Sequence, residues 1–393
     1  MVEQGPSKYK GTGGHAPRAG MGRLRAANSQ DQARVGGWER RHEDEDFVES
    51  HGHRSRRSHG GESLLAKFNR LADEYREDLT KGERGEICGF AGKTVIVRAG
   101  DGHEIPCQVR QVLKKRISGV KNPLCIGDRV RFVRTSASGA SDLAGADGVI
   151  DAVEPRHNQL ARTDSHNKAL MHVFAANIDR LVVVAALADP DLKYGLIDRY
   201  LLIAAHNNIS ATVVLTKTDL RDGEATRALY EGIGIPAFAV CALRGVERSA
   251  GIEALRAHLA GCTCVFAGQS GVGKSSLVNT LFPDVAARVG AVASAGHGRH
   301  TTTSARSYEV AGGGRLIDTP GVRECGITGL TQLDVALFYP DIAAHHPKCR
   351  FDDCSHLREP DCAVRAAVAS GAIAATRYES YRSIVTEDLT ENG

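Results

Sequence analysis

Residues 265–279 read VFAGQSGVGKSSLVN, and this stretch decides the fold. Its centre fits the pattern G-x-x-x-x-G-K-[ST], in which glycines allow backbone N–H groups to surround phosphate oxygens. An apolar strand-like run, CTCVFA, precedes the pattern and a helix-forming run, SSLVNTLF, follows it. The stretch therefore predicts a phosphate-binding loop at the start of a helix, whose N-terminus adds partial positive charge. A chance glycine-rich turn is the alternative.

The residues of this loop have separate expected roles on a bound nucleotide. Lys274 should reach the β- and γ-phosphates, and the hydroxyl of Ser275 should bind Mg²⁺. The other positions should contact phosphate mainly through backbone N–H groups. The predicted phosphate-binding set is Gly268, Gln269, Ser270, Gly271, Val272, Gly273, Lys274, Ser275 and Ser276.

A second segment, TVVLTKTDL at 212–220, predicts the choice of base. Asp219 can accept hydrogen bonds from N1–H and the exocyclic amine of guanine, and adenine lacks both donors at these positions. The stem of Lys217 can cover the plane of the base. Thr216 stands where the usual pattern has asparagine, so we expect guanine preference with a weaker brace to the phosphate loop and reduced affinity. With the backbone N–H of Ala242 as a last contact, the predicted guanine-binding set is Thr216, Lys217, Thr218, Asp219 and Ala242.

Two downstream segments should complete the phosphate side of the site. Asp318 ends the apolar run RLID, where its carboxylate can hold the hydration shell of Mg²⁺, and Gly321 lets a backbone N–H approach the γ-phosphate. The intervening run GHGRHTTT at 296–303 is polar and contains three consecutive threonines. We expect it to be a switch loop in which Thr302 binds Mg²⁺ when the γ-phosphate is present. A polar surface loop is the alternative.

The group that orients the attacking water is not evident in the sequence. In Ras-like enzymes a glutamine close after the DxxG segment does this, whereas Val322 follows Gly321 here. We therefore expect slow intrinsic hydrolysis that a partner accelerates. His300 is the candidate to position the water, and Thr302 is the second candidate catalytic residue. Contact with RNA or solvent is the alternative role for His300.

The base-reading segment precedes the phosphate loop, which reverses the usual GTPase order. From residue 178 onward, apolar runs alternate with helix-forming stretches around 193–206, 224–232 and 249–260, which indicates a parallel sheet covered on both faces. Such sheets build their sites from loops at the carboxyl ends of strands. A cut at the opposite edge would leave the site intact, so the order predicts one circularly permuted GTPase fold.

The chain before this sheet contains two kinds of sequence. Residues 1–60 are rich in Gly, Ser, Arg and His and are expected to be disordered, and residues 61–84 are expected to form a short amphipathic helix and linker. Within 85–155 the runs TVIVRA, EIPCQVRQV, DRVRFVR and DGVIDAV predict a small OB-type β-barrel. Its basic residues could bind nucleic acid or only solubilise the surface: Arg110, Lys114, Lys115, Arg116, Lys121, Arg129, Arg131 and Arg134.

A Cys/His cluster lies near the C-terminus. Three thiolates and one imidazole suit tetrahedral Zn²⁺, and four protein ligands leave no open position, so we expect one structural zinc ion. Chance clustering of surface residues is the alternative. His345 and His346 fall outside the spacing and are expected to face solvent or RNA. The predicted ligands are Cys349, Cys354, His356 and Cys362.

Taken together, these motifs resemble one family. A basic barrel, TKTD, GQSGVGKSSLVN, GRHTTT, DTPGVRE and the Cys/His cluster follow the order of the circularly permuted GTPases of the ribosome small-subunit-dependent GTPase A family. The resemblance implies a multi-domain protein with an OB-type barrel, an α/β GTPase domain at 156–326 and a mostly helical zinc-binding domain at 327–393. It implies hydrolysis of GTP to GDP and phosphate, stimulated by the small (30S) ribosomal subunit, in late maturation of that subunit through rRNA binding.

Bulk composition sets further limits. With 393 residues and a net charge of +3, the chain is long enough for two or three domains but too weakly charged to argue nucleic-acid binding by itself. No apolar stretch reaches the roughly 20 residues that span a bilayer, and scattered cysteines favour a cytoplasmic location. We expect a monomer that uses GTP or GDP, Mg²⁺ and one Zn²⁺. The alternatives are an RNA-binding module with a structural nucleotide and a metabolic P-loop kinase.

Overall fold

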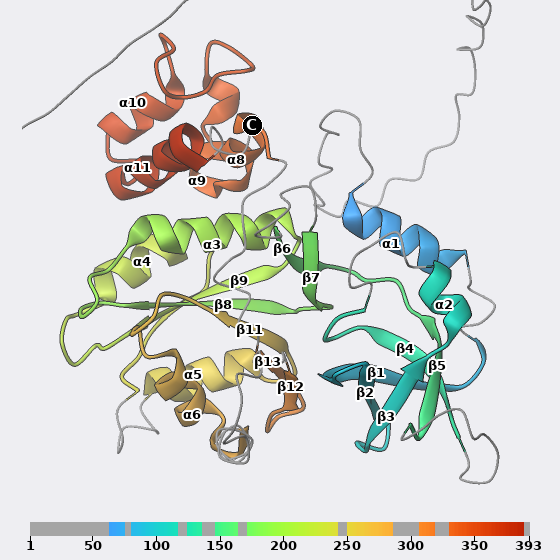
Figure 1. Ribbon diagram of the computed structural model, residues 1–393. Coiled ribbons are helices and arrows are strands. Elements are labelled where there is room, and N and C mark those ends of the chain that lie inside the picture. Colours follow the sequence, from blue (N-terminus) through green and yellow to red (C-terminus); the bar gives the residue numbers. More distant parts are fainter. Residues whose placement is uncertain are drawn as a thin grey trace, which may run out of the picture. The chain divides into compact units, whose positions relative to one another are not determined.

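A computed structural model describes residues 63–74, 80–116, 124–135, 146–163, 171–242, 250–285, 306–318 and 330–388. The predicted disordered tail at 1–60 lies outside these residues. The described elements form a β-barrel, a mixed six-stranded sheet between helices, and a group of short C-terminal helices (Figure 1). None of the helices in the described part of the chain is long and apolar enough to cross a membrane.

The barrel closes in the strand order β1-β2-β3-β5-β4. Its strands are β1 (Glu83–Ala91), β2 (Thr94–Ala99), β3 (Glu104–Val109), β4 (Arg129–Arg134) and β5 (Gly148–Val153). Alternate residues point inward, so that Val97, Phe132 and Ile150 are fully buried. Gly85 lets the strands pack this closely, since a Cβ there would lie 2.4 Å from Val97 Cγ1. The predicted OB-type barrel is confirmed.

Two helices accompany the barrel. The predicted strand EIPCQVRQV ends early, because β3 stops at Val109 and residues Gln111–Arg116 form α2. The predicted amphipathic helix is α1 (Leu64–Asp73), which begins where the Ser63 side chain accepts a hydrogen bond from the Ala66 N–H at 3.1 Å. Its apolar face buries Phe68, which is 1% exposed.

A buried arginine holds the segment PRHNQLAR in place. Arg156 donates two hydrogen bonds to Asp128, at 2.7 and 2.8 Å, and its guanidinium lies 3.6 Å from the centre of the Phe68 ring. Both charged side chains of the pair are fully buried. A two-stranded antiparallel sheet of β6 (Gln159–Thr163) and β7 (Met171–Ala176) follows. This hairpin was not among the strands predicted from the sequence.

The six-stranded sheet has the order β10-β9-β8-β11-β13-β12. All neighbouring strands are parallel except the pair β12–β13. The strands are β8 (Arg180–Ala186), β9 (Ser210–Thr216), β10 (Ala237–Ala239), β11 (Thr263–Ala267), β12 (Arg306–Glu309) and β13 (Arg315–Asp318). The chain thus builds one half of the sheet before the phosphate-loop strand β11, as the permuted order requires.

Helices cover both faces of this sheet (Figure 1). The helices α3 (Tyr194–His206) and α4 (Glu224–Gly232) lie on one face, and α5 (Ala250–Leu259) and α6 (Lys274–Leu281) lie on the other. Strand β8 supplies both cores, because Leu181 and Val183 point to one cluster while Val182 and Val184 point to the other. The predicted sheet with two covered faces is confirmed.

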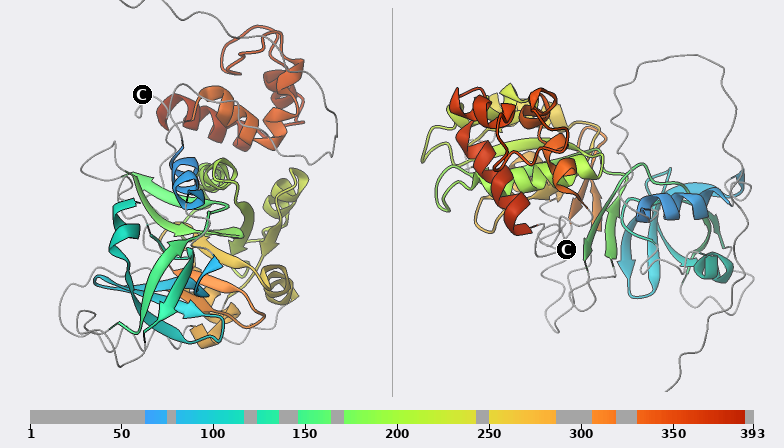
Figure 2. Two further views of the ribbon diagram at one scale, coloured as in Figure 1. Left: turned by 90° about the vertical axis from the view of Figure 1, so that its right-hand side faces the viewer. Right: turned by 90° about the horizontal axis from the view of Figure 1, so that it is seen from above.

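Short helices make up the C-terminal group (Figure 2). They are α8 (Gln332–Phe338), α9 (Pro340–Ala343), η3 (His346–Lys348), α10 (Ala363–Ala369), α11 (Ala375–Ser383) and the π-helix η4 (Ile384–Asp388). Arg377 of α11 joins this group to the sheet region. Its guanidinium pairs with Asp198 of α3 at 2.5 Å and with Asp341 of α9 at 3.0 Å, and it is 2% exposed.

Candidate nucleotide and metal sites

The phosphate loop joins β11 to α6 and depends on backbone geometry that other residues rarely adopt. Gly268 has φ of 146°, and a Cβ there would lie 2.2 Å from the carbonyl oxygen of Val184 on β8. Gly273 has φ of 88° immediately before the first residue of α6. The loop therefore packs directly against the middle of the sheet and leads into a helix N-terminus, which favours anions.

The lysine of the loop bends over the loop itself. Lys274 Nζ donates to the carbonyl oxygens of Gly268 and Gln269, at 2.9 and 2.6 Å. Val272 is buried, whereas Ser275 and Ser276 at the start of α6 are exposed. The ammonium group thus lies against the loop, and the exposed Ser275 at the start of α6 leaves room for phosphate oxygens and a divalent cation to bind.

Thr216 connects the base-reading segment to the phosphate loop. It is 1% exposed, and its hydroxyl lies 2.6 Å from the carbonyl oxygen of Val272 and 3.2 Å from that of Ala185. A hydroxyl has one hydrogen to donate, and the shorter distance favours Val272. The brace that was expected to weaken when threonine replaces asparagine is therefore present, made by the hydroxyl.

The other residues of the base-reading segment lie beside it at the carboxyl end of β9. Lys217 has φ of 62°, and its ammonium group donates to the carbonyl oxygen of Asp189 in the loop after β8. Asp219 is exposed, and the Cys241 thiol lies 3.4 Å from its Oδ1. Ala242 follows Cys241 in sequence, so the structure brings this predicted contact close to Asp219. A ligand could reach the carboxylate from solvent.

The third part of the predicted nucleotide site is only partly described. Asp318 ends β13, next to the phosphate-loop strand β11. Its side chain is exposed overall, yet neighbouring protein atoms desolvate the carboxylate and raise its pKa above the usual range. A bound cation would favour the ionised form. The predicted residues His300, Thr302 and Gly321 lie outside the described residues.

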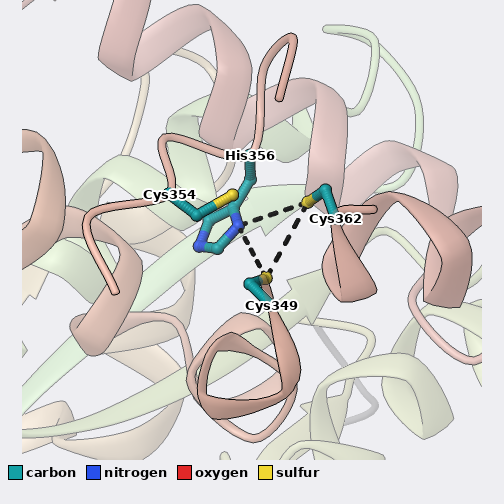
Figure 3. Close-up of side chains that lie close together, drawn as sticks. All are labelled: Cys349, Cys354, His356 and Cys362. Carbon is teal, nitrogen blue, oxygen red and sulfur yellow. Dashed lines mark hydrogen bonds between the residues drawn. The ribbon is translucent and has the colours of Figure 1, made fainter. Parts of the chain in front are cut away.

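The four predicted metal ligands converge on one point (Figure 3). Their ligand atoms all lie within 4.8 Å of one another. His356 Nδ1 lies 3.6 Å from the sulfur of Cys349 and 3.5 Å from that of Cys362, and the two sulfurs are 4.0 Å apart. Around a tetrahedral zinc ion, bonds of about 2.3 Å to sulfur and about 2.0 Å to nitrogen place ligand atoms roughly 3.5–3.8 Å apart. The residues fit a tetrahedral metal ion.

Burial makes this cluster unfavourable without a cation. In the metal-free chain, burial raises the pKa of the Cys354 thiol to about 12 and also raises that of Cys362. Burial, and then the neighbouring His346, lower the pKa of His356 to about 4. A divalent cation stabilises thiolates and needs a neutral imidazole, so it would offset the cost of burying these groups.

Several residues that shape the metal loop were not predicted from the sequence. Glu359 accepts hydrogen bonds from the backbone N–H groups of Ser355 at 2.8 Å and Leu357 at 3.1 Å. Burial opposes ionisation of Glu359, but hydrogen bonds lower its pKa to about 2. Tyr378 donates to the carbonyl oxygen of His356 at 2.7 Å. His346, expected to face solvent or RNA, instead meets the ring of His356. No sequence spacing marks these contacts.

Three of the candidate basic residues of the barrel have acidic partners. Arg110 pairs with Asp151 at 2.5 Å, and Arg131 lies 3.5 Å from Glu154. Arg134 pairs with both Glu83 and Asp101. These three arginines therefore lie beside carboxylates while their side chains stay partly exposed, and the choice between nucleic-acid binding and a solubilising surface stays open. Lys121 lies outside the described residues, while Lys114, Lys115 and Arg116 end the helix α2.

Comparisons with known proteins agree with this architecture. A sequence model of the RsgA GTPase family matches residues 153–328. The Small ribosomal subunit biogenesis GTPase RsgA of Histophilus somni (strain 2336) is 39% identical over 304 residues, which cover 76% of this chain and 84% of the relative.

Solved structures show the same fold. YjeQ from Thermotoga maritima aligns with a TM-score of 0.60 and 30% identity, over 78% of this chain and 98% of that one. YloQ, described as a circularly permuted GTPase, aligns with a TM-score of 0.59 and 24% identity, over 80% of this chain and 97% of its own. The chain therefore belongs to the RsgA GTPase family of circularly permuted GTP hydrolases.

Proposed function

We propose that the protein hydrolyses GTP to GDP and phosphate in the biogenesis of the small ribosomal subunit. The main structural support for this proposal is the hydrogen bond between Thr216 and Val272, which joins the base-reading segment to the phosphate loop. The name of these relatives supports the biological setting, since it describes small ribosomal subunit biogenesis. The partner in this proposal is the small (30S) subunit with its rRNA, and binding to it stimulates hydrolysis.

The nucleotide would bind at the carboxyl ends of the parallel strands of the six-stranded sheet. Asp219 would accept hydrogen bonds from the guanine edge, Lys217 would cover the ring, and the backbone of Ala242 would add a contact. Lys274 would exchange its two carbonyl acceptors for the β- and γ-phosphates. The backbone groups from Gly268 to Ser276 would hold the other phosphate oxygens.

Magnesium and the attacking water form the remaining part of the reaction site. Mg²⁺ would be held by Ser275 and Thr302, with Asp318 on its hydration shell, and would neutralise charge on the transferred phosphoryl group. His300 is the proposed group that positions the water. Binding of the small subunit would complete the arrangement of these residues, and this would produce the proposed stimulation without a glutamine after Gly321.

The Cys/His cluster would hold one structural Zn²⁺. Cys349, Cys354, His356 and Cys362 fill a tetrahedral shell, so the ion would stabilise the C-terminal helices and take no part in hydrolysis. The barrel would contact rRNA through its basic residues. The carboxylates beside Arg110, Arg131 and Arg134 would weaken the attraction of these three to phosphate groups.

We propose the domain division that the sequence predicts, with a tail at 1–60, a helix and linker at 61–84, a barrel at 85–155, a GTPase domain at 156–326 and a zinc domain at 327–393, although strand β1 of the barrel already begins at Glu83. We propose a cytoplasmic monomer as the working form.

Membership of the RsgA GTPase family argues against a metabolic P-loop kinase. A comparison of ATP binding with GTP binding tests that alternative directly.

GTP turnover titrated with purified small and large subunits separately tests the proposal. Stimulation by small subunits alone is expected. Equal stimulation by both subunits, or by neither, would contradict the assigned partner. A single-turnover measurement on bound small subunits would separate hydrolysis from a purely structural nucleotide, since a structural nucleotide would remain GTP.

A further inference from the structure

A second histidine lies behind the metal ligand His356. His346 Nδ1 is 3.0 Å from His356 Nε2, and the two rings meet edge to face with centroids 5.0 Å apart and planes at 89°. His356 is completely buried. Its other ring nitrogen, Nδ1, faces the sulfurs of Cys349 and Cys362. The imidazole is thus enclosed between the thiol groups on one side and His346 on the other.

A bound metal ion would fix the direction of this hydrogen bond. A metal takes the lone pair of His356 Nδ1, so the ring proton must sit on Nε2. Nε2–H then donates to His346 Nδ1, which must be unprotonated to accept it. Metal-binding histidines usually donate their second N–H to a carboxylate, a backbone carbonyl or water. Here the acceptor is another imidazole.

A neutral acceptor suits the charge of this centre. Zn²⁺ with three thiolates carries a net charge of −1, and a carboxylate behind His356 would add a second negative charge next to buried groups. Separating such charges from water is costly. An imidazole accepts the same hydrogen bond without adding charge.

The position of His346 is built into the local fold. It begins the short helix η3, and Cys349 follows that helix directly, with its N–H donating to the His346 carbonyl oxygen at 3.0 Å. The turn at η3 therefore supplies both the metal ligand Cys349 and the residue His346, which contacts the metal ligand His356. The backbone of His356 is held separately by Tyr378. The hydrogen bond with His346 can therefore influence the orientation of the His356 ring, which the backbone contact of Tyr378 does not determine.

We propose that His346 is a positioning residue for the metal centre: it accepts the Nε2–H hydrogen bond of His356 and holds that ring in the tautomer and orientation that present Nδ1 to the metal. This inference rests on the metal centre proposed above. Loss of such a support typically weakens metal binding by roughly 10–100-fold.

The test compares zinc affinity of four full-length proteins by competition with a chromophoric chelator. His346→Phe keeps an aromatic ring but removes the acceptor, and zinc should bind roughly 10–100-fold more weakly. His346→Asn places an amide oxygen near the position of Nδ1 and should restore most of the affinity. His345→Phe is the matched control, because His345 Nδ1 contacts the Asp341 carbonyl oxygen at 3.0 Å instead of the metal loop.

The outcomes separate this inference from the proposed metal centre. Wild-type protein that binds no zinc would refute the centre itself and with it the role of His346. If wild type binds zinc and His346→Phe binds it equally well, the centre stands and the inference is wrong. Equal weakening in His346→Phe and His346→Asn, or in His345→Phe, would also overturn it, because the acceptor atom would then not matter. Absorption of the Co²⁺-substituted proteins gives a second readout of the ligand geometry.

Discussion

The nucleotide site and the metal site are assembled in opposite ways. The nucleotide residues come from the carboxyl ends of different strands, Thr216–Asp219 from the end of β9 and Gly268–Ser275 from the loop after β11 and the start of α6, and the sheet brings them together. The metal ligands all lie within the short run 349–362. The first site needs the fold to be complete before it exists, whereas the second can contribute to the folding of its own region. Substitutions in the nucleotide site should therefore change nucleotide binding, whereas loss of the metal should change the folding of the C-terminal region.

Metal removal should have the largest effect and should be confined to one region. Structural zinc in small domains contributes on the order of 10 kcal/mol of apparent binding free energy, so chelation should unfold the C-terminal helices. Hydrogen exchange should show loss of protection in α10 and α11 but not in the six-stranded sheet. Loss of protection in the sheet as well would contradict the separation of the two sites.

Cutting the link between the two regions should cost less. Arg377 is buried between Asp198 and Asp341, and removing one partner of a buried ion pair typically costs about 3–5 kcal/mol. Arg377→Met should lower the free energy of unfolding by that amount in a denaturant titration. Arg382→Met is the control, because its pair with Glu379 is exposed and should contribute little. Equal losses of unfolding free energy in Arg377→Met and Arg382→Met would show that the buried ion pairs of Arg377 do not stabilise the contact between the two regions.

Asp219→Asn should change the choice of base. Asparagine offers one acceptor and one donor, which match xanthine instead of guanine, so GTP affinity should fall by roughly 100-fold while XTP affinity rises. Fluorescent-nucleotide competition measures both. Asp222→Asn, on an exposed side chain of the same loop, should change neither. Unaltered GTP preference in Asp219→Asn would show that the base is recognised elsewhere.

Thr216→Val should weaken nucleotide binding without changing the base preference. Valine has nearly the same shape but leaves the Val272 carbonyl oxygen without its donor, which costs about 1–3 kcal/mol. GDP should then bind roughly 10-fold more weakly in a calorimetric titration. Thr216→Ser keeps the hydroxyl and should retain most of the affinity. If valine and serine behave alike, the brace does not stabilise the phosphate loop.

Glu359→Gln should give the smallest effect and only in the metal region. Its carboxylate accepts backbone N–H groups of the metal loop, and a neutral amide accepts them less strongly, by about 1 kcal/mol. Zinc release to a chelator should become faster while GDP affinity is unchanged. A change in GDP affinity would mean that the two sites are not independent.

The same contrast explains what the sequence could predict. The phosphate loop and the TKTD segment are motifs whose chemistry is local, so their residues and their meeting at one sheet edge were predictable. The four metal ligands followed from residue type and from the resemblance to the family, because their spacing is not that of a common zinc finger. The contacts of His346 and Glu359 were not predictable, because they depend on how the metal loop folds and not on a spacing in the sequence.

The barrel shows another limit. Arg134 looked like an outward positive charge, yet it pairs with Glu83 and Asp101, which lie 51 and 33 residues away. Such cross-strand partners appear only once the strand order is known. The β6–β7 hairpin was not predicted, although Asp164, Ser165 and Asn167 between its strands are typical turn residues.

The most direct test of the central claim is a crystal structure with Mg²⁺ and a non-hydrolysable GTP analogue. The guanine edge should face the Asp219 carboxylate, and the triphosphate of the same molecule should lie in the loop from Gly268 to Ser275. A triphosphate held in that loop with its base turned away from Asp219 would contradict the account.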